Sequence, residues 1–129
     1  MILVLDSNEY IDYLNQKNSL DALFSNQYLD IGINDLIIRE VIRNLNELQI
    51  KKFYKIIFSN NIEFYGQKLP SDVLENFRRF GLKKGDIAIA AFCETIGADY
   101  LITENRHFLK SREFHFKILS LKGFLSKFR

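Results

Sequence analysis

Short apolar runs alternate along this chain with longer stretches in which apolar residues recur every three or four positions. A short run bounded by polar residues indicates a strand, and the longer spacing indicates an amphipathic helix. The segments that predict strands are 2–5, 29–33, 62–65, 100–102 and 116–119. The first of them is apolar at every position, so we expect it to be buried on both faces of a sheet.

The stretches between these strands predict helices with identifiable ends. Ser7 suits the cap of the first helix, and Asn34 or Asp35 suits the cap of a later one. Pro70 is typical of a first helical turn, and Gly97 is typical of a helix end. The predicted helices cover 7–14, 20–24, 36–48, 52–58, 70–80, 86–96 and 121–128.

Strands that alternate with helices predict a parallel sheet whose faces are covered by right-handed crossovers. The chain has 129 residues, of which 47% are hydrophobic and only 1 is proline, a composition that favours a folded domain over disorder. We therefore expect one α/β domain over residues 1–129. Its three layers (α/β/α) would enclose a central, mostly parallel sheet of four to five strands.

The apolar runs are too short for a membrane protein. None approaches the roughly 18 residues that are needed to span a bilayer. The apolar start, 1–5, is too short for a signal peptide and lacks a basic beginning. We expect a cytoplasmic protein without membrane association. The single cysteine, Cys93, fits a reducing compartment, and its apolar helix predicts a buried thiol.

The net charge of +2 neither requires nor excludes a nucleic-acid ligand, but the distribution of charge is informative. Lys83 and Lys84 precede Asp86, and Arg106 directly follows Asn105. Basic side chains at such places bind phosphates in nucleic-acid-binding proteins. A solvated basic surface explains them equally well.

Four residues stand out by their places in the predicted elements. Asp6 ends the first strand, Glu40 lies beside the apolar stripe of its helix, and Asp86 opens a helix. Asn105 follows the fourth strand. Ligands of open parallel sheets gather beyond the carboxyl ends of the strands, and carboxylates gathered there require a cation or a proton. Oxygen ligands without a histidine or cysteine cluster favour Mg²⁺ or Mn²⁺ over Zn²⁺.

Each of these residues also has an ordinary structural explanation. Asp6 could cap the first helix, and Glu40 could face solvent. Asp86 could interact with the dipole of its helix, and Asn105 could shape a turn. The residues alone leave these alternatives open.

Taken in order, the segments resemble the motifs of PIN-domain nucleases, most closely the small VapC-type toxins of toxin–antitoxin pairs. The segments that carry the resemblance are VLDSNEYI, LIIREVIRNL and GDIAIAAFCETIGADYLITENRHF, and the resemblance extends from residue 1 to about residue 125. It implies a PIN-like fold and an endoribonuclease, a hydrolase of RNA phosphodiester bonds that depends on Mg²⁺ or Mn²⁺.

The resemblance also implies roles for individual residues. The implied catalytic and metal-binding residues are Asp6, Glu40, Asp86 and Asn105. The implied supporting residues are Ser7, Asn8 and Thr103, and the candidates for RNA binding are Lys83, Lys84 and Arg106. Asn105 stands where many members have aspartate, which places a second metal ion in doubt. Glu104 is an alternative fourth ligand.

The partners that the resemblance implies are an RNA substrate, a cognate antitoxin protein and a second copy of the chain in a homodimer. An alternative function is a non-catalytic PIN-like scaffold that binds RNA or protein, because Asn105 brings no charge. A phospho-acceptor receiver or a dehalogenase-type phosphatase fits less well. The phosphatase requires a second aspartate where Asn8 stands, and the receiver requires acidic residues before Asp6.

Overall fold

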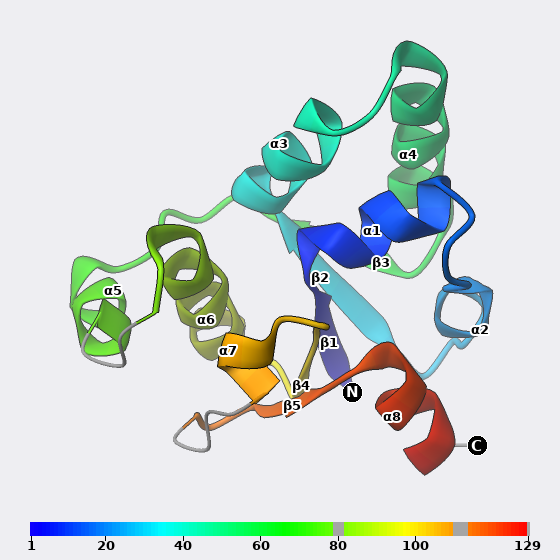
Figure 1. Cartoon of the computed structure of the whole chain (residues 1–129). Helices are drawn as coiled ribbons and strands as arrows, with labels where there is room; N and C mark the ends of the chain where they lie inside the picture. Colours follow the sequence, from blue (N-terminus) through cyan, green and yellow to red (C-terminus); the bar gives the residue numbers. More distant parts are fainter. Residues whose placement is uncertain (79–81, 110–113, 129) are drawn as a thin grey trace.

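A computed structural model describes residues 1–78, 82–109 and 114–128 (Figure 1). Its centre is a five-stranded sheet with the order β3-β2-β1-β4-β5, in which every pair of neighbouring strands is parallel. The strands are β1 (Ile2–Leu5), β2 (Asp30–Asn34), β3 (Ile62–Tyr65), β4 (Tyr100–Ile102) and β5 (Lys117–Leu119). The predicted fold class is confirmed, with five strands that are all parallel.

Helices connect the strands and surround the sheet (Figure 1). They are α1 (Ser7–Leu14), α2 (Asp21–Phe24), α3 (Asp35–Arg43), α4 (Glu47–Ser59), α5 (Ser71–Arg78), α6 (Lys84–Ile96), α7 (Arg106–Leu109) and α8 (Leu121–Lys127). Within the described residues, no helix is long and apolar enough to cross a membrane. The predicted helix 70–80 corresponds to α5, and its last two residues lie outside the described part of the chain.

Two predicted helix boundaries are wrong because side-chain capping overrides the apolar spacing. The predicted helix 36–48 ends earlier, since α3 stops at Arg43. The predicted helix 52–58 begins earlier, since α4 starts at Glu47. Asn46 accepts a hydrogen bond from the Gln49 N–H, and the Gln49 side chain accepts one from the Asn46 N–H. This reciprocal pair starts a new helix at Glu47 and places 48 inside α4.

The predicted cap of α1 is also different. Asp6 occupies the N-cap position without a capping hydrogen bond from its side chain, and Ser7 is the first helical residue. The carboxylate of Asp6 is therefore available for other contacts. Asn34, one of the two predicted caps, caps α3, and its side chain accepts a hydrogen bond of 3.0 Å from the Ile37 N–H. The short helix α7 was not predicted, since four residues are too few to show a helical period.

The order of the strands reverses at β1, and a ligand-binding crevice is expected at the carboxyl end of this strand. The chain passes from β1 outward to β2 and β3, and then returns through α5 and α6 to β4 on the other side of β1. The Asp6 N–H donates to the Ile102 carbonyl at 3.0 Å, so the pairing of β1 and β4 extends to their ends. A reversal of this kind is where open α/β sheets bind their ligands.

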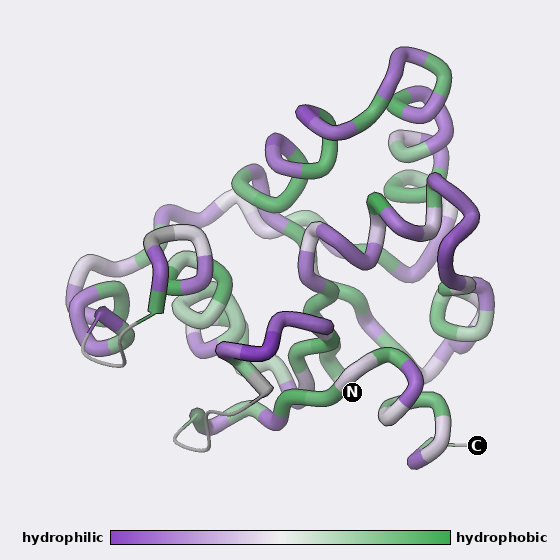
Figure 2. The backbone as a smooth tube through the Cα atoms, viewed as in Figure 1, coloured by the Kyte–Doolittle hydropathy of each residue, from purple (hydrophilic) through white to green (hydrophobic). Residues whose placement is uncertain are grey.

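Both faces of β1 are covered, since Leu3, Val4 and Leu5 point to alternate faces and none is exposed. Figure 2 shows the same feature as hydrophobic colour along the central strands. Cys93 is fully buried, as predicted, and burial raises the pKa of its thiol.

The face of β2 approaches α6 at Gly32, which has no side chain. A Cβ atom at this position would lie 2.6 Å from Ile96 Cδ1 and 3.6 Å from the Phe92 ring. A glycine in the interior of a strand thus permits close contact between the helix and the sheet.

We expect Gly32→Ala to destabilise the fold by about 1–3 kcal/mol, because the new methyl group overpacks this contact. Chemical denaturation measured by circular dichroism provides the free energy of unfolding. The matched control is Gly85→Ala in α6, where a Cβ meets nothing within 4 Å. Alanine should stabilise that helix position by roughly 0.5–1 kcal/mol. Equal stability of both variants would contradict the proposed contact.

Candidate functional site

Asp6 is a buried carboxylate at the carboxyl end of β1, with 7% of its surface exposed. The Thr103 hydroxyl, at the end of the neighbouring strand β4, donates to Asp6 Oδ2 at 2.7 Å. The Ser7 hydroxyl lies 3.4 Å from Asp6 Oδ1. Since Thr103 and Ser7 are themselves fully buried, they hold Asp6 in a fixed place within the crevice.

The turn after β4 connects Asp6 with Asp86. The Thr103 hydroxyl oxygen accepts a hydrogen bond of 3.0 Å from the Asn105 N–H. The Asn105 side-chain amino group donates to Asp86 Oδ1, in the first turn of α6, at 3.2 Å. The Asn105 carbonyl oxygen accepts a hydrogen bond from the His107 N–H at 2.9 Å, which shapes the start of α7. A continuous series of hydrogen bonds thus joins β1, β4 and α6.

The electrostatic environment of Asp6 opposes its ionisation. Burial raises the pKa of the Asp6 carboxyl above its ordinary value, while the hydrogen bonds from the Thr103 side chain and the Ser7 backbone lower it. The nearby carboxylates of Glu40 and Asp86 raise this pKa further. Glu40 on α3 and Asp86 on α6 are therefore close enough to Asp6 to repel its negative charge.

Glu40 is the least constrained of these acids. Its side chain is exposed on α3, and its main-chain carbonyl oxygen accepts a hydrogen bond from the Asn44 amide. In the described part of the chain, no three acidic, histidine or cysteine side chains lie close enough together to hold a metal ion. A cation bound by all three predicted carboxylates would require Glu40 to turn toward Asp6.

The other predicted residues lie around the same edge of the sheet. Asn8 is exposed on α1, Lys83 is exposed at the N-cap of α6, and Arg106 is exposed at the start of α7. Lys84 is the first residue of α6, and its side chain is not among those described. The segment that leads into α7 is strongly hydrophilic (Figure 2).

Glu104, the alternative fourth ligand, points to a different neighbourhood. Its Oε1 atom accepts a hydrogen bond of 3.1 Å from the Leu121 N–H at the start of α8. Its negative charge also raises the pKa of the Glu9 carboxyl group. In this structure Asn105, and not Glu104, contacts Asp86.

Glu9 is the residue that the sequence interpretation missed. It lies on α1 with only 1% of its surface exposed, and burial is the main cause that raises its pKa to about 8. The carboxylates of Glu104, Asp12 and Asp6 raise it further. The signal available in the sequence was that Glu9 follows Asp6 by three residues. This spacing is about one helical turn, which brings two side chains near each other.

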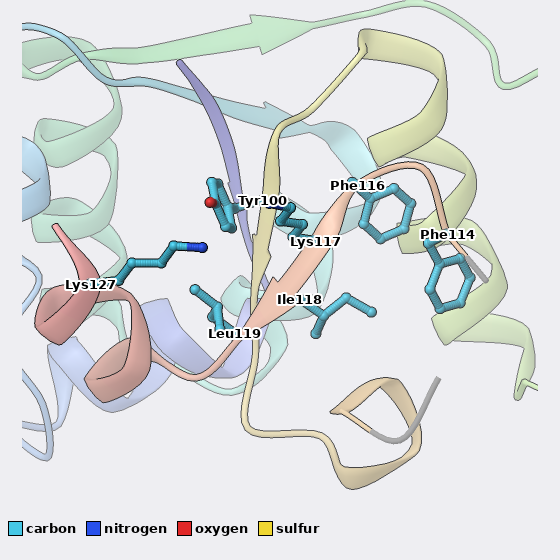
Figure 3. A pocket seen from close by; sticks show the side chains of 7 residues that line it. All are labelled: Tyr100, Phe114, Phe116, Lys117, Ile118, Leu119 and Lys127. Carbon is cyan, nitrogen blue, oxygen red and sulfur yellow. The ribbon is translucent and has the colours of Figure 1, made fainter. Parts of the chain in front are cut away.

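A hollow of about 310 Å³ lies beside the edge strand β5 (Figure 3). Its lining residues are Tyr100, Phe114, Phe116, Lys117, Ile118, Leu119 and Lys127. None of them belongs to the predicted site, and the acids lie beyond the carboxyl ends of the strands. The candidate site is therefore the crevice around Asp6.

We expect Thr103→Val to lower the free energy of unfolding by roughly 1–3 kcal/mol, because it leaves the buried Asp6 carboxylate and the Asn105 N–H without their common partner. Urea denaturation measures the effect. The matched control is Thr95→Val, which removes an exposed hydroxyl that bonds only within its own helix. That control should change stability by less than about 0.5 kcal/mol, and a similarly small effect at Thr103 would contradict the role of the hydrogen bonds.

The pKa of Glu9 predicts a dependence of stability on pH. The folded pKa of about 8 exceeds the ordinary value of 4.5, so the folded state retains a proton that the unfolded state releases. The contribution of Glu9 to the free energy of unfolding should be greatest below pH 4.5 and should be lost between 4.5 and about 8. The loss is roughly 1.4 kcal/mol for each unit of pKa difference.

The measurement compares the wild-type chain with Glu9→Gln by urea denaturation from pH 4 to pH 9 in EDTA. The variant should lack the decline that Glu9 causes, so the two curves diverge as the pH rises. The exposed residue Glu47 provides a matched control, and Glu47→Gln should follow the wild-type curve. Parallel curves for Glu9→Gln and the wild type would exclude an ionisation of Glu9 in this range.

Proteins of known structure share the fold of this chain. No family model and no curated protein matches the sequence. The structure is similar to a chain of VapBC2 from Rickettsia felis, solved bound to a DNA fragment from its promoter. That match has a TM-score of 0.69 and 20% identity, and it covers 93% of this chain and 98% of the other. The PIN domain of T. brucei RRP44 matches with a TM-score of 0.66 and 12% identity, over 98% of this chain and 80% of the other.

Identities this low support a conclusion about the fold. Both matches extend over nearly the whole of this chain. The chain has a PIN-domain fold, as its resemblance to VapC-type proteins implied.

Proposed function

We propose that this protein is a metal-dependent endoribonuclease and the toxin component of a toxin–antitoxin pair. The observation that carries the proposal is the convergence of Asp6, Asp86 and Asn105 on the crevice of a PIN fold, with Glu40 near enough to affect the ionisation of Asp6. Acids gathered from separate elements at a ligand-binding edge are typical of an active site.

The residues fit a hard divalent cation by their chemistry. Asp6, Glu40 and Asp86 present carboxylate oxygens, and their mutual repulsion is relieved by a positive charge between them. We propose that they hold Mg²⁺ or Mn²⁺; Asn105, the predicted fourth ligand, would have to turn its side-chain oxygen from the His107 N–H toward the ion to join them. Such a cation polarises a phosphoryl oxygen and activates water for hydrolysis of a phosphodiester.

The protein's own side chains would orient this site. Thr103 fixes Oδ2 of Asp6, which leaves Oδ1 facing the weaker contact with Ser7. The amino group of Asn105 holds Asp86 at the same edge. Phosphate groups of RNA would be held by the basic residues that flank the acids, namely Lys83, Lys84 and Arg106. Such contacts provide affinity without reading the sequence of the RNA.

A protein partner is part of the proposal. The solved neighbour from Rickettsia felis is a VapBC2 assembly, which supports an antitoxin for this chain. The outer surface of α4 also exposes apolar side chains, among them Phe58 at 82% and Leu48 at 64%. The Phe58 ring stacks on Tyr54, with centroids 6.4 Å apart. An exposed apolar group of this kind favours burial against an antitoxin or a second copy.

The test is cleavage of single-stranded and structured RNAs by the purified protein with Mg²⁺, with Mn²⁺ and with EDTA. We expect cleavage with either cation and none in EDTA. Asp6→Asn and Asp86→Asn should reduce the rate by more than the ~10–100-fold that the loss of a second-shell partner costs. Cleavage that survives in EDTA or in these variants would exclude the proposed site.

The matched control is Asp72→Asn, which makes the same chemical change at an exposed position on α5. It should cleave RNA at the wild-type rate. The neutral Asn105 favours one alternative, a scaffold that binds RNA or protein without cutting it. Tight RNA binding that needs no cation, combined with absent cleavage, would support that alternative.

A further inference from the structure

The hollow beside β5 lies at an edge of the sheet, and the proposed nuclease site does not use it. β5 ends the strand order, and within the described residues it pairs with β4. The hollow, of about 310 Å³, is lined from both faces of β5 (Figure 3). Lys117, Leu119 and Lys127 lie on one side of the strand, and Phe116 and Ile118 lie on the other. An edge strand with space along both faces is a template for a further strand.

The outer edge of β5 presents the backbone groups of Ile118. The Lys117 N–H donates to the Asp99 carbonyl, and the Leu119 carbonyl accepts from the Thr103 N–H, each at 3.0 Å. These two residues of β5 therefore direct their backbone groups toward β4. Successive residues of a strand direct their N–H and C=O groups to opposite sides, so those of Ile118 point to the outer edge. They are placed to pair with the backbone of an added strand.

One face of the hollow carries positive charge. Its described lining includes Lys117 and Lys127 and no acidic side chain. The Lys127 ammonium lies 5.5 Å from the centre of the Tyr100 ring and 5.8 Å from that of Phe128, contacts that hold its charge beside the hollow. In the part of the chain that the structure describes, neither lysine forms an ion pair. This face favours a ligand that brings negative charge.

The opposite face of β5 is apolar. Phe116 is buried and Ile118 is half-buried, and the Phe114 ring stacks on that of Phe116 with centroids 4.9 Å apart. The side chains of an added strand alternate between the two faces of the sheet. A strand that fits this edge would thus place acidic side chains near Lys117 and Lys127, and apolar side chains near Ile118.

We propose that the β5 edge is a docking site for an extended peptide segment of a partner protein, in which acidic and apolar residues alternate. The segment adds a strand to the sheet, with backbone hydrogen bonds that provide affinity and alternate side chains that provide specificity. The proposal does not rest on the proposed nuclease function, because it concerns a different edge of the molecule and is tested by binding alone.

The charge of the hollow argues against other occupants. Two β5 edges paired around a two-fold axis would bring Lys117 and Lys127 of both copies onto one face, where like charges are destabilising. A nucleic acid would satisfy the lysines, but it has no row of amide groups to pair with the backbone of Ile118. An acidic extended peptide satisfies both.

The probe is a short fluorescein-labelled peptide in which valine alternates with glutamate. Its fluorescence anisotropy is measured during titration with the full chain at pH 7.5. Three reference peptides keep the composition but separate valine and glutamate into blocks, replace glutamate by lysine, or carry N-methyl groups in place of the amide protons. They test alternation, charge and backbone pairing in turn.

The protein variants separate charge from backbone pairing in the same way. Lys127→Glu reverses one charge of the hollow, and Lys122→Glu makes the same change at an exposed position of α8 outside the lining. Ile118→Pro removes the outward N–H, a change that an edge strand tolerates. Ile118→Ala also truncates the side chain but keeps this N–H. Circular dichroism checks the fold of each variant.

We expect the alternating peptide to bind the wild type and Lys122→Glu equally, and to bind Lys127→Glu about 10-fold more weakly or worse. Ile118→Pro should bind it more weakly than Ile118→Ala by a similar factor, and the reference peptides should also bind weakly. If Ile118→Pro does not fold, the N-methylated peptide decides, since it removes the hydrogen bonds from the other partner.

Three results would overturn the proposal. The first is absent binding of the alternating peptide, or equal binding of the alternating and block peptides. The second is displacement of the peptide by single-stranded RNA that depends on Lys127 but not on the Ile118 N–H, which would assign the hollow to nucleic acid. The third is a dimer, detected by light scattering, that Lys127→Glu strengthens, which would assign the edge to a second copy.

Discussion

The hydrogen bond between the Thr103 hydroxyl and the Asp6 carboxylate is the interaction on which the candidate site depends. It is buried, 2.7 Å long, and it joins the carboxyl ends of the two strands on either side of the reversal in strand order. A hydrogen bond to a charged group in a place of low dielectric is strong, and it is correspondingly harmful to lose. The same hydroxyl oxygen receives the Asn105 N–H, so one side chain fixes both a strand end and a turn.

This arrangement has an energetic cost, because it places carboxylates where water is scarce. Asp6 and Glu9 are both more than nine-tenths buried, and both have raised pKa values because burial disfavours their charged forms. Such acids are poor choices for stability alone, since apolar residues would fill the same volume without the penalty. A proton on Glu9 avoids this penalty, and the proposed cation would offset it at Asp6.

Much of the architecture could be predicted from the sequence, because each element has a local signal. The apolar strands, Gly97 at the end of α6 and Asn34 at the start of α3 follow rules that act over a few residues. The break between α3 and α4 was misplaced because the Asn46–Gln49 capping box outweighs an apolar period that runs through it. The four residues of α7 are too few to show any period.

The candidate site was predicted in part, because some of its residues also have local signals in the sequence. Asp6 and Asp86 could be found from their places beside a strand and a helix, and the structure joins them through Thr103 and Asn105. Glu9 was missed, because its spacing of three residues after Asp6 is a weak signal and its burial is a property of the folded chain. The orientation of Asn105, with its amino group toward Asp86, is likewise set by contacts within the folded turn.

The missing side chain at Gly32 affects more than the packing of the sheet. Ile96, which fills the space above Gly32, is the last residue of α6, and Asp86 is in the first turn of the same helix. The two ends are ten positions apart, roughly 15 Å along a rigid helix. A methyl group added at 32 would displace the Cδ1 end of Ile96, so the absence of a side chain on β2 lets the helix that carries Asp86 lie close to the sheet.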